Sequence, residues 1–289
     1  MNHHVPDPRT AIALAAEQVV LDYDDRLVLK GASLTIPRGR RVALLGANGS
    51  GKTTLLRALS GAHVPRSGAI VVDGTALRHN RAGLREHRQR VQLVTQDPDD
   101  QLFSADVTQD ISFGPMNLGL AEPEVRERVD EAIALLAIEH LSDRPVHRLS
   151  HGEAKRVALA GAVAMRPAVV LLDEPTAGLD PAGVAEMMAA MSRLEEWGST
   201  VCLSTHEVDH ALAWADEAAV VVDGTIRQGP AADILGDERL LAAARLTKPW
   251  PLALIARLVA GGLLPQGTTA RTVDEVSAAL LRQRPTERR

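Results

Sequence analysis

The chain has 289 residues, of which 45% are hydrophobic and 24% charged, and this ordinary globular usage excludes a disordered or fibrous protein. Its formal net charge of -5 gives no bulk attraction to nucleic acid or anionic lipid. A single cysteine, Cys202, excludes an internal disulfide framework and suits a reducing cytosol. The length allows one large domain, or one domain with an appendage.

We expect neither a targeting signal in the first residues nor a membrane-spanning segment in the longest apolar window. The start, MNHHVPDPRT, has no apolar stretch behind a basic segment, so we expect no secretory signal and a flexible segment over residues 1–14. His3 and His4 are interpreted as part of this segment rather than as a metal site. The longest apolar window, 251–264, is interrupted by Arg257 and is shorter than the roughly 20 residues that a membrane-spanning helix requires. If the protein works at a membrane, another chain must cross it.

Short β-branched runs alternate with helical patterns along most of the chain. Runs such as VALL and VVLL are continuously apolar, which is typical of strands covered on both faces. Between 105 and 166 the pattern becomes helical, with helices expected over 124–138 and 150–165, and after 229 it indicates short helices with a break at 261–267. The sequence therefore predicts an α/β core over 15–229 with an inserted α-helical subdomain at about 100–166, followed by a small helical extension over 230–289. Strands are expected at 41–45, 69–73, 91–95, 169–173, 200–204 and 218–222.

A glycine-rich loop follows the first of these runs. The residues GANGSGKT, 46–53, fit the pattern G-x-x-x-x-G-K-[ST] between the strand RVALL and the helix TTLLRALSG. The glycines allow successive N–H groups and the helix N-terminus to face nucleotide phosphates. Lys52 is then placed to bridge the β- and γ-phosphates, and the Thr53 hydroxyl to hold Mg²⁺. The alternative is a glycine-rich turn without a ligand, and the strand–loop–helix context favours the nucleotide. The core is therefore predicted to be a P-loop NTPase.

A second motif, VVLLDEP, ends a buried strand in two adjacent carboxylates. Asp173 is expected to orient the Mg²⁺ shell. Because the chain turns at the strand end, Glu174 is expected to face the γ-phosphate and polarise an attacking water. The alternative for Glu174 is a surface acid at a turn.

Over about residues 15–230 these and further motifs resemble the ATP-binding cassette (ABC) ATPases. Tyr23 is similar to the aromatic residue that stacks on adenine, and Gln96 resembles the loop glutamine that links the nucleotide site to the helical subdomain and, with Thr53 and Asp173, is expected to hold Mg²⁺. LSHGE, at 149–153, occupies the position of the signature sequence, DEPTAGLD includes the loop residue Asp180, and His206 is similar to the switch histidine. The resemblance implies catalytic roles for Glu174, His206 and Gln96. It also implies ATP binding by Tyr23, Gly46, Asn48, Gly49, Ser50, Gly51, Lys52, Thr53 and Thr54.

The resemblance further implies a dimer in which each ATP lies between one subunit's phosphate loop and the other subunit's signature helix. Ser150 and the Gly152 N–H would then form part of an anion site at a helix start. Two residues depart from the family's usual LSGGQ, because His151 replaces a glycine and Glu153 a glutamine. A side chain at 151 restricts the backbone and a carboxylate at 153 repels phosphate, which would indicate a degenerate site. We favour an active site because Ser150, Gly152, Glu174 and His206 remain.

Two patterns have competing interpretations. HEVDH, at 206–210, matches the zinc motif H-E-x-x-H, but it starts at the end of an expected strand and no third ligand stands out. The five arginines of the basic run are interpreted as a solvated face rather than a nucleic-acid patch. They are Arg78, Arg81, Arg85, Arg88 and Arg90.

The segment QDPDDQLFSADVTQDISFGPMNLGL is similar to the ATPase subunits of energy-coupling-factor importers, and most of all to the cobalt type. In that family the glutamine loop leads into a groove that receives coupling helices of a transmembrane component. Pro98 favours a helix start, with Asp99 or Asp100 as its cap. An apolar edge would then be presented to the partner, with internal packing of Phe103 as the alternative. The expected coupling residues are Asp100, Gln101, Leu102 and Phe103.

The predicted function is therefore that of an ATP-hydrolysing subunit at the cytoplasmic face of the cell membrane. ATP and Mg²⁺ are its expected ligands, and its expected partners are a second ABC ATPase, identical or not, a transmembrane coupling subunit and a substrate-binding membrane subunit. A single phosphate loop argues against ribosome-acting members, and the lack of a heptad insert argues against DNA-repair members. Cobalt as cargo rests on resemblance alone, with nickel or a vitamin as alternatives, and a stand-alone regulatory ABC ATPase is the alternative of another class. The C-terminal extension is expected to assist dimerisation.

Overall fold

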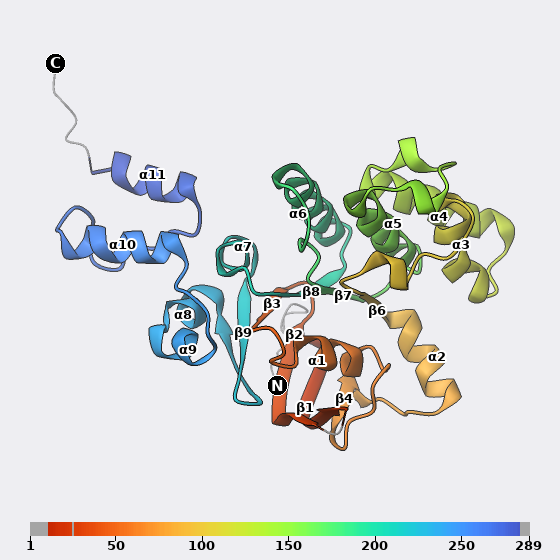
Figure 1. Ribbon diagram of the computed structural model, residues 1–289, viewed down its shortest axis with the longest axis horizontal. Helices are drawn as coiled ribbons and strands as arrows, with labels where there is room; N and C mark the ends of the chain where they lie inside the picture. Colours follow the sequence, from red (N-terminus) through yellow and green to blue (C-terminus); the bar gives the residue numbers. More distant parts are fainter. Residues whose placement is uncertain (1–10, 25, 284–289) are drawn as a thin grey trace, which may run out of the picture.

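The computed structural model describes residues 11–24 and 26–283 as two β-sheets flanked by helices (Figure 1). The positions of His3 and His4 lie outside the described residues. The expected flexible segment to residue 14 is too long, because the first strand already begins at Ile12. Its apolar side chains from Ala13 to Ala16 are buried, and this burial holds the segment in the sheet.

The larger sheet has six strands in the order β10-β9-β3-β8-β7-β6. All are parallel except β10, which pairs antiparallel with β9 at one edge. Helices pack against both faces, so the continuously apolar runs are buried on both sides. Five of the six expected strands lie in this sheet, within one residue of their predicted ends. The strands are β3 (Arg41–Leu45), β6 (Val91–Val94), β7 (Val169–Asp173), β8 (Thr200–Thr205), β9 (Glu217–Val222) and β10 (Thr225–Pro230).

The sixth expected strand, 69–73, corresponds to β4 and belongs to a separate four-stranded antiparallel sheet in the order β2-β1-β4-β5. Helix α1 (Lys52–Leu59) packs between the two sheets, because its buried leucines share one core cluster with residues of both. The two long strands of this sheet were not predicted; the first is Ala-rich and is interrupted at Gln18, where φ is 49°. The strands are β1 (Ile12–Tyr23), β2 (Arg26–Pro37), β4 (Ser67–Val72) and β5 (Thr75–Ala76).

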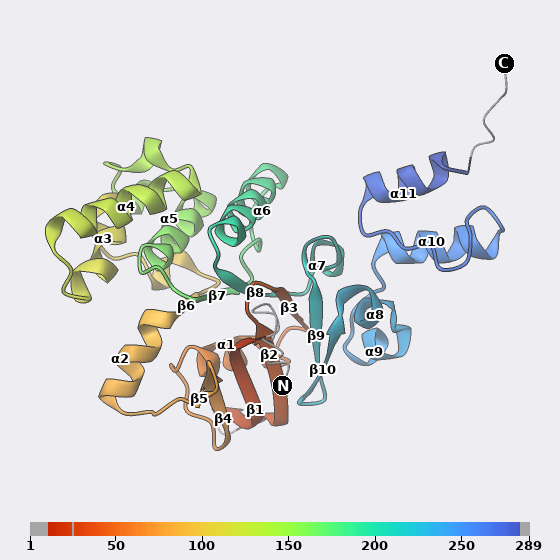
Figure 2. The same cartoon turned by 180° about the vertical axis from the view of Figure 1, so that it is seen from behind.

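A helical region lies beyond the β6 edge of the larger sheet (Figures 1 and 2). The predicted helix at 124–138 is present but begins two residues earlier, and the helix predicted to start near Ser150 begins at His151. Four of the five arginines of the basic run lie on the helix that faces this region, which has Asn80 as its N-cap, and Arg78 precedes that cap. The elements are α2 (Arg81–Arg90), α3 (Val107–Asn117), α4 (Glu122–Leu136) and α5 (His151–Val163), with 3₁₀ turns η2 (Pro98–Asp100), η3 (Glu139–Leu141) and η4 (Val146–Arg148).

The remaining helices complete the core and extend the chain at the opposite end of the molecule (Figure 1). Residues of α6 to α9 join the main core, whereas α10 and α11 have a small cluster of their own around Ile255 and Val276. Within the described residues, no helix has both the length and the apolar character needed to span a membrane. The helices are α6 (Pro181–Glu196), α7 (Val208–Trp214), α8 (Ala231–Gly236), α9 (Glu238–Ala243), α10 (Trp250–Ala260) and α11 (Val273–Leu281).

Candidate nucleotide site

The glycine-rich loop joins β3 to α1 at the carboxyl edge of the larger sheet, as predicted. Gly51 has φ 106° and packs so tightly that a Cβ there would lie 2.4 Å from Val28 Cγ1. A Cβ at Gly46 would lie 2.6 Å from Ser50 Oγ. Neither position accepts a larger residue without a shift of the loop. The helix start has no side-chain cap and no acidic residue in its first turn, so its N–H groups and positive dipole end suit an anion.

Two polar side chains of the loop fit a phosphate ligand. The Ser50 Oγ is buried and has no hydrogen-bond partner among the described residues. Lys52 is only 6% exposed, and its Nζ donates to the carbonyl oxygens of Gly46 at 2.9 Å and Ala47 at 3.4 Å. A buried ammonium needs anionic or carbonyl partners. Phosphate oxygens would supply stronger partners than these carbonyls do.

Asp173, the last residue of β7, and Glu174, which follows it, have different surroundings. Asp173 Oδ1 accepts a hydrogen bond of 2.5 Å from the Ser204 hydroxyl at the end of β8. Glu174 turns away with φ 48°, and its N–H donates to Ser204 Oγ at 3.1 Å and Ser204 O at 3.2 Å. Ser204 therefore contacts the side chain of Asp173 and the backbone of Glu174, at the point where the chain turns between the two residues. Sequence reasoning missed this serine, because a hydroxyl inside an apolar strand gives no pattern of its own.

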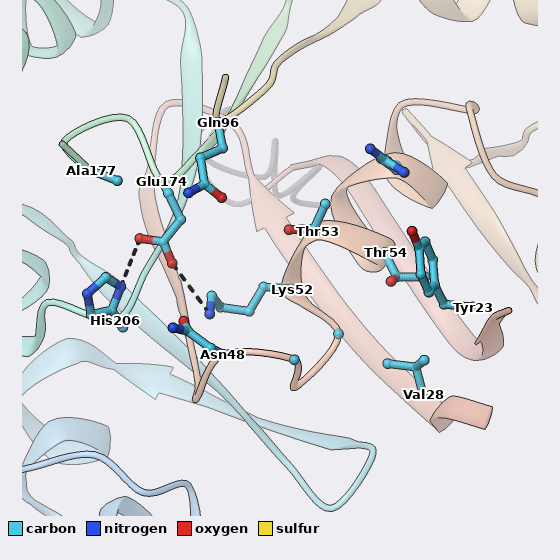
Figure 3. Close-up of a pocket in the computed structure, with 13 residues that line it drawn as sticks. Tyr23, Val28, Asn48, Lys52, Thr53, Thr54, Gln96, Glu174, Ala177 and His206 are labelled. Carbon is cyan, nitrogen blue, oxygen red and sulfur yellow. Dashed lines mark hydrogen bonds and ion pairs between the residues drawn. The ribbon is translucent and has the colours of Figure 1, made fainter. Parts of the chain in front are cut away.

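The Glu174 side chain lies between the Lys52 ammonium and the His206 imidazole (Figure 3). It is 7% exposed, with Oε1 3.5 Å from Lys52 Nζ and Oε2 3.0 Å from His206 Nδ1. The structure thus brings Lys52, Glu174 and His206 together from β3–α1, β7 and β8. The alternative of a surface acid is wrong, because Glu174 is buried.

These residues line one cleft of about 430 Å³ (Figure 3). Tyr23 is half exposed at one end of the cleft, beside Val28 and Thr54, and His206 lies at the other end. Gln96 lines this cleft and a second one of about 410 Å³, where it joins Thr53 and Asp173. The cleft therefore offers an aromatic surface for stacking at the Tyr23 end and charged groups for binding phosphate at the Glu174 end.

The signature segment starts α5 with a complete capping box. Ser150 Oγ accepts from the Glu153 N–H at 3.3 Å, and Glu153 Oε2 accepts from the Ser150 N–H at 2.7 Å. This backbone hydrogen bond lowers the pKa of Glu153, and Arg144 Nη1 pairs with Glu153 Oε1 at 3.0 Å. The expected repulsion by a carboxylate at 153 is therefore reduced, because that charge is paired within the chain.

The four signature residues do not all meet the cleft of their own chain. His151 lines the second cleft, near Thr53 and Asp173, whereas Ser150, Gly152 and Glu153 line neither cleft. Asp180 caps α6, because its Oδ1 accepts from the Gly183 N–H at 2.7 Å. These positions leave the start of α5 exposed to a second molecule.

The segment after Gln96 differs in detail from the prediction. The cap of η2 is Asp97, whose Oδ1 accepts from the Asp99 N–H at 3.1 Å, so Asp99 and Asp100 are not the cap. Gln101 and Asp100 line a groove beside this segment, and the Gln101 amide is bound to the backbone at the end of β6, since Oε1 accepts from the Thr95 N–H and Nε2 donates to Leu93 O, both at 2.9 Å. An unpaired sheet edge supplies these two backbone groups.

Phe103 is 63% exposed, so the alternative of internal packing is wrong. Its ring meets Phe113 edge-to-face, with centroids 4.6 Å apart. Both rings, with Leu102 and Met165, line a groove of about 1070 Å³ whose opposite wall belongs to α2. Arg81, Arg85 and Arg88 line that wall, so the basic run is part of a groove rather than only a solvated face.

The zinc alternative does not fit the observed elements. His206 precedes α7, which starts at Val208, so the two imidazoles of HEVDH do not share a helical face. His206 faces Glu174, whereas His210 Nδ1 lies 3.4 Å from Glu207 Oε2.

A phosphate loop, a buried acidic pair and an exposed aromatic residue in one cleft define a nucleotide-binding ATPase of the P-loop class. Residues 29–177 match the family model described as ABC transporter. The chain is 46% identical to a cobalt import ATP-binding protein from Rhodobacter capsulatus, over 92% of this chain and 96% of that protein. It is 40% identical to an energy-coupling factor transporter ATP-binding protein from Methanosphaera stadtmanae, over 85% of this chain and 89% of the other.

A solved structure of cbiO1 from Clostridium perfringens, described as part of the ABC transporter complex cbiONQ, is also similar. It gives a TM-score of 0.73 at 40% identity and covers 85% of this chain and 99% of that one. The chain therefore belongs to the ABC transporter family of ATPases, which hydrolyse ATP in coupling to transport. The predicted fold class and family are confirmed.

Proposed function

We propose that the cleft binds ATP with Mg²⁺ and that Glu174 activates the water that attacks the γ-phosphate. The observation that carries this proposal is the position of the Glu174 carboxylate, buried and held between Lys52 Nζ and His206 Nδ1. A carboxylate in such a position accepts a proton from water while the adjacent Lys52 ammonium stabilises charge on the phosphoryl oxygens.

The other residues of the cleft receive binding roles. Tyr23 stacks on adenine, and the loop N–H groups with Lys52 hold the phosphates. Thr53, Gln96 and Asp173 would hold Mg²⁺, since oxygen ligands suit this ion and the three residues line one cleft. Bound Mg²⁺ would neutralise charge on the phosphate oxygens. His206 holds the Glu174 carboxylate at the phosphate end of the cleft through the contact of its Nδ1 with Oε2.

Glu174→Gln should leave ATP binding intact and lower turnover by at least about 100-fold, because the amide is a poor base. ATP binding and steady-state hydrolysis of the purified chain measure the two effects. Glu207→Gln is the matched control, because Glu207 is an exposed carboxylate next to His206 and lies outside the cleft. Hydrolysis retained in Glu174→Gln would remove Glu174 from this role.

We propose further that two ABC ATPase subunits close on ATP, with the start of α5 from one subunit completing the site of the other. Support comes from the exposed helix start, where the capping box orders Ser150 and Arg144 pairs the Glu153 carboxylate. The Ser150 hydroxyl proton and the Gly152 N–H are then available to a phosphate. Asp180 shapes the same surface from the start of α6.

The cycle of closing and opening is proposed to drive an importer of the energy-coupling-factor type, with the chain bound to the cytoplasmic face of the membrane through a transmembrane subunit. The names of two relatives, a cobalt import protein and an energy-coupling factor transporter protein, support this importer class. Cobalt is the proposed cargo, recognised by a separate membrane subunit. Uptake of cobalt, nickel and a vitamin by cells with and without the complete complex would identify the cargo.

The groove beside Gln96 is proposed to receive the coupling helices of that transmembrane subunit. Its apolar wall exposes Phe103 and lies on the segment that leads from the nucleotide cleft. An amphipathic helix would bury this wall on docking.

Leu102→Ala with Phe103→Ala should abolish uptake while basal ATP hydrolysis persists, because these side chains line the groove and not the cleft. Transport and hydrolysis are compared in reconstituted complexes. Trp197→Ala is the control, since it removes another exposed aromatic side chain outside the groove. Normal uptake in the double variant would contradict the coupling role.

A further inference from the structure

Lys155 is a buried cation that the nucleotide cleft does not include. It lies one turn into α5 and is only 3% exposed. Its Nζ donates to three backbone carbonyl oxygens in the loop after β7: Glu174 at 3.1 Å, Pro175 at 3.3 Å and Ala177 at 2.8 Å. All three ammonium protons therefore have acceptors, and all three acceptors belong to the segment that carries Glu174.

The Glu174 peptide is consequently held from two sides. Its N–H is bound by Ser204 of β8, and its carbonyl oxygen is bound by Lys155 of α5. Between these two anchors the backbone has φ 48°, a left-handed conformation that a non-glycine residue adopts only when its surroundings impose it. The direction of the Glu174 side chain depends on this backbone conformation.

We propose that Lys155 is a positioning residue for hydrolysis, which holds the loop after β7 so that the Glu174 carboxylate stays between Lys52 and His206. The inference rests on the proposed role of Glu174 and adds a residue that lies outside the lining of the nucleotide cleft. Lys155 also joins this loop to α5, the helix that Ser150 caps, so a displacement of α5 would be transmitted to Glu174.

The chemistry of the contact favours a role beyond packing. Burial lowers the pKa of the Lys155 ammonium, and the carboxylates of Glu174, Asp97 and Asp173 act in the opposite direction. Burying a lysine costs the hydration free energy of its ammonium, and an apolar side chain of the same length would fill the space without that cost. The three carbonyl oxygens converge on one nitrogen, and an ammonium is the side-chain group that carries three protons on a single atom.

Removing the ammonium should change kcat more than KM for ATP. In Lys155→Met the chain length is kept and the three hydrogen bonds are lost, so the loop relaxes and Glu174 moves from its position. A displacement of about 1 Å at a catalytic group costs on the order of 100-fold in rate. We expect kcat to fall by about 100-fold and ATP binding to change little. Lys155→Gln, which keeps two N–H donors, should recover part of the loss.

The matched control is Arg193→Met, because Arg193 Nε also donates to a backbone carbonyl, that of Leu135 at 2.6 Å, between α6 and α4. This control removes a cation-to-carbonyl bond between helices without contact to the Glu174 loop. Each variant is measured for thermal unfolding, ATP binding, kcat and KM in the full chain.

The inference is supported if kcat falls in Lys155→Met but not in Arg193→Met, when the two variants have comparable thermal stability. Partial recovery of kcat in Lys155→Gln is expected in addition. Equal kcat in Lys155→Met and the wild type overturns it, as does a loss of kcat that follows thermal stability in both variants. If Lys155→Met does not fold, the kcat of Lys155→Gln decides, since unchanged kcat there also overturns the inference. Glu174→Gln is measured in parallel: retained turnover in that variant overturns the proposed function and the positioning role together, whereas lost turnover beside a normal Lys155→Met overturns only the latter.

Discussion

Ser204 shows at the residue scale how one neutral side chain organises two charged ones. Its hydroxyl donates to Asp173, its oxygen accepts from the Glu174 N–H, and the residue is completely buried. Because β7 and β8 are parallel neighbours, Asp173 pairs with Ser204 in register, and the contact follows from strand pairing. Asp173 lines one cleft with Thr53 and Gln96, the other Mg²⁺ ligands that we propose, while the Glu174 carboxylate lies beside Lys52.

Ser204→Ala should weaken hydrolysis and stability without removing ATP binding. Asp173 loses its only side-chain donor among the described residues, and a buried acceptor without its partner costs about 1–3 kcal/mol. The free energy of unfolding should fall by that amount, and kcat by about 10-fold as Asp173 and Glu174 lose orientation.

Ser192→Ala provides the control, since the Ser192 hydroxyl donates to Met188 O on the exposed side of α6. Denaturant unfolding and ATP turnover of both variants provide the measurement. Equal losses in the two variants would contradict a specific role for Ser204.

At the scale of elements, His87 joins the helix that lines the groove to the helix that follows the phosphate loop. The side chain is buried, and its Nε2 lies 2.7 Å from Leu59 O at the end of α1. Its Nδ1 is buried without a partner among the described residues. Burial lowers the pKa of His87, with the Leu59 backbone hydrogen bond acting in the opposite direction and the charges of His79 and Arg88 lowering it further.

The contact between α2 and α1 should therefore weaken in acid. The folded-state pKa of His87 is below its unfolded value, so the unfolded chain binds more protons and stability falls as the pH decreases through the unfolded pKa of about 6.5. At pH above that value the contribution is fully present. Denaturation midpoints between pH 7.5 and 5.0 should fall more steeply for the wild type than for His87→Gln, whose amide keeps a donor for Leu59 O. Identical pH slopes would contradict the assignment.

At the scale of the whole molecule, the C-terminal helices form two groups. Leu235 of α8 and Leu241 of α9 are buried in the main core, whereas α10 and α11 pack around a separate small cluster. The second group contacts the main body through Leu252 of α10, which packs against the main core. It is also joined by the Trp250 N–H, which donates to Asp209 Oδ1 at 2.9 Å, and by Arg271 Nη1, which donates to Ala215 O at 3.0 Å. The described part of the proposed extension, 230–283, thus contains helices that complete the ATPase core and a second group that we propose to assist dimerisation.

Truncation should separate these two parts. A chain that ends at residue 247 keeps α8 and α9, so its ATP binding and thermal stability should remain close to those of the full chain while self-association weakens. A chain that ends at residue 229 exposes the core surface under Leu235 and Leu241, and the loss of each buried leucine costs about 2–5 kcal/mol. Thermal unfolding and sedimentation compare both truncations with the full chain. Equal stability of the two would contradict this division.

Much of the site was predictable because its signals are local. The glycine loop must lie between a strand and a helix to present N–H groups, and the sequence GANGSGKT carries that requirement in eight consecutive residues. The apolar run VVLLD likewise predicts a buried strand with an acid at its end, and β7 has the predicted bounds. Phe103 could be singled out for its rarity, but its exposure depended on which surface the helical region left uncovered.

The sequence by itself determined the class of chemistry, because phosphate binding and water activation require residue types at fixed short spacings. Only the tertiary structure decided how the carboxylates are held, because Ser204, Lys155 and Arg144 act across 30, 19 and 9 positions of sequence. It likewise decided that Asp97 caps η2 and that Gln101 bonds the β6 edge, since neighbouring polar residues compete for the same backbone groups. Such contacts leave no periodic pattern, because their geometry is set by which strands and helices pack together.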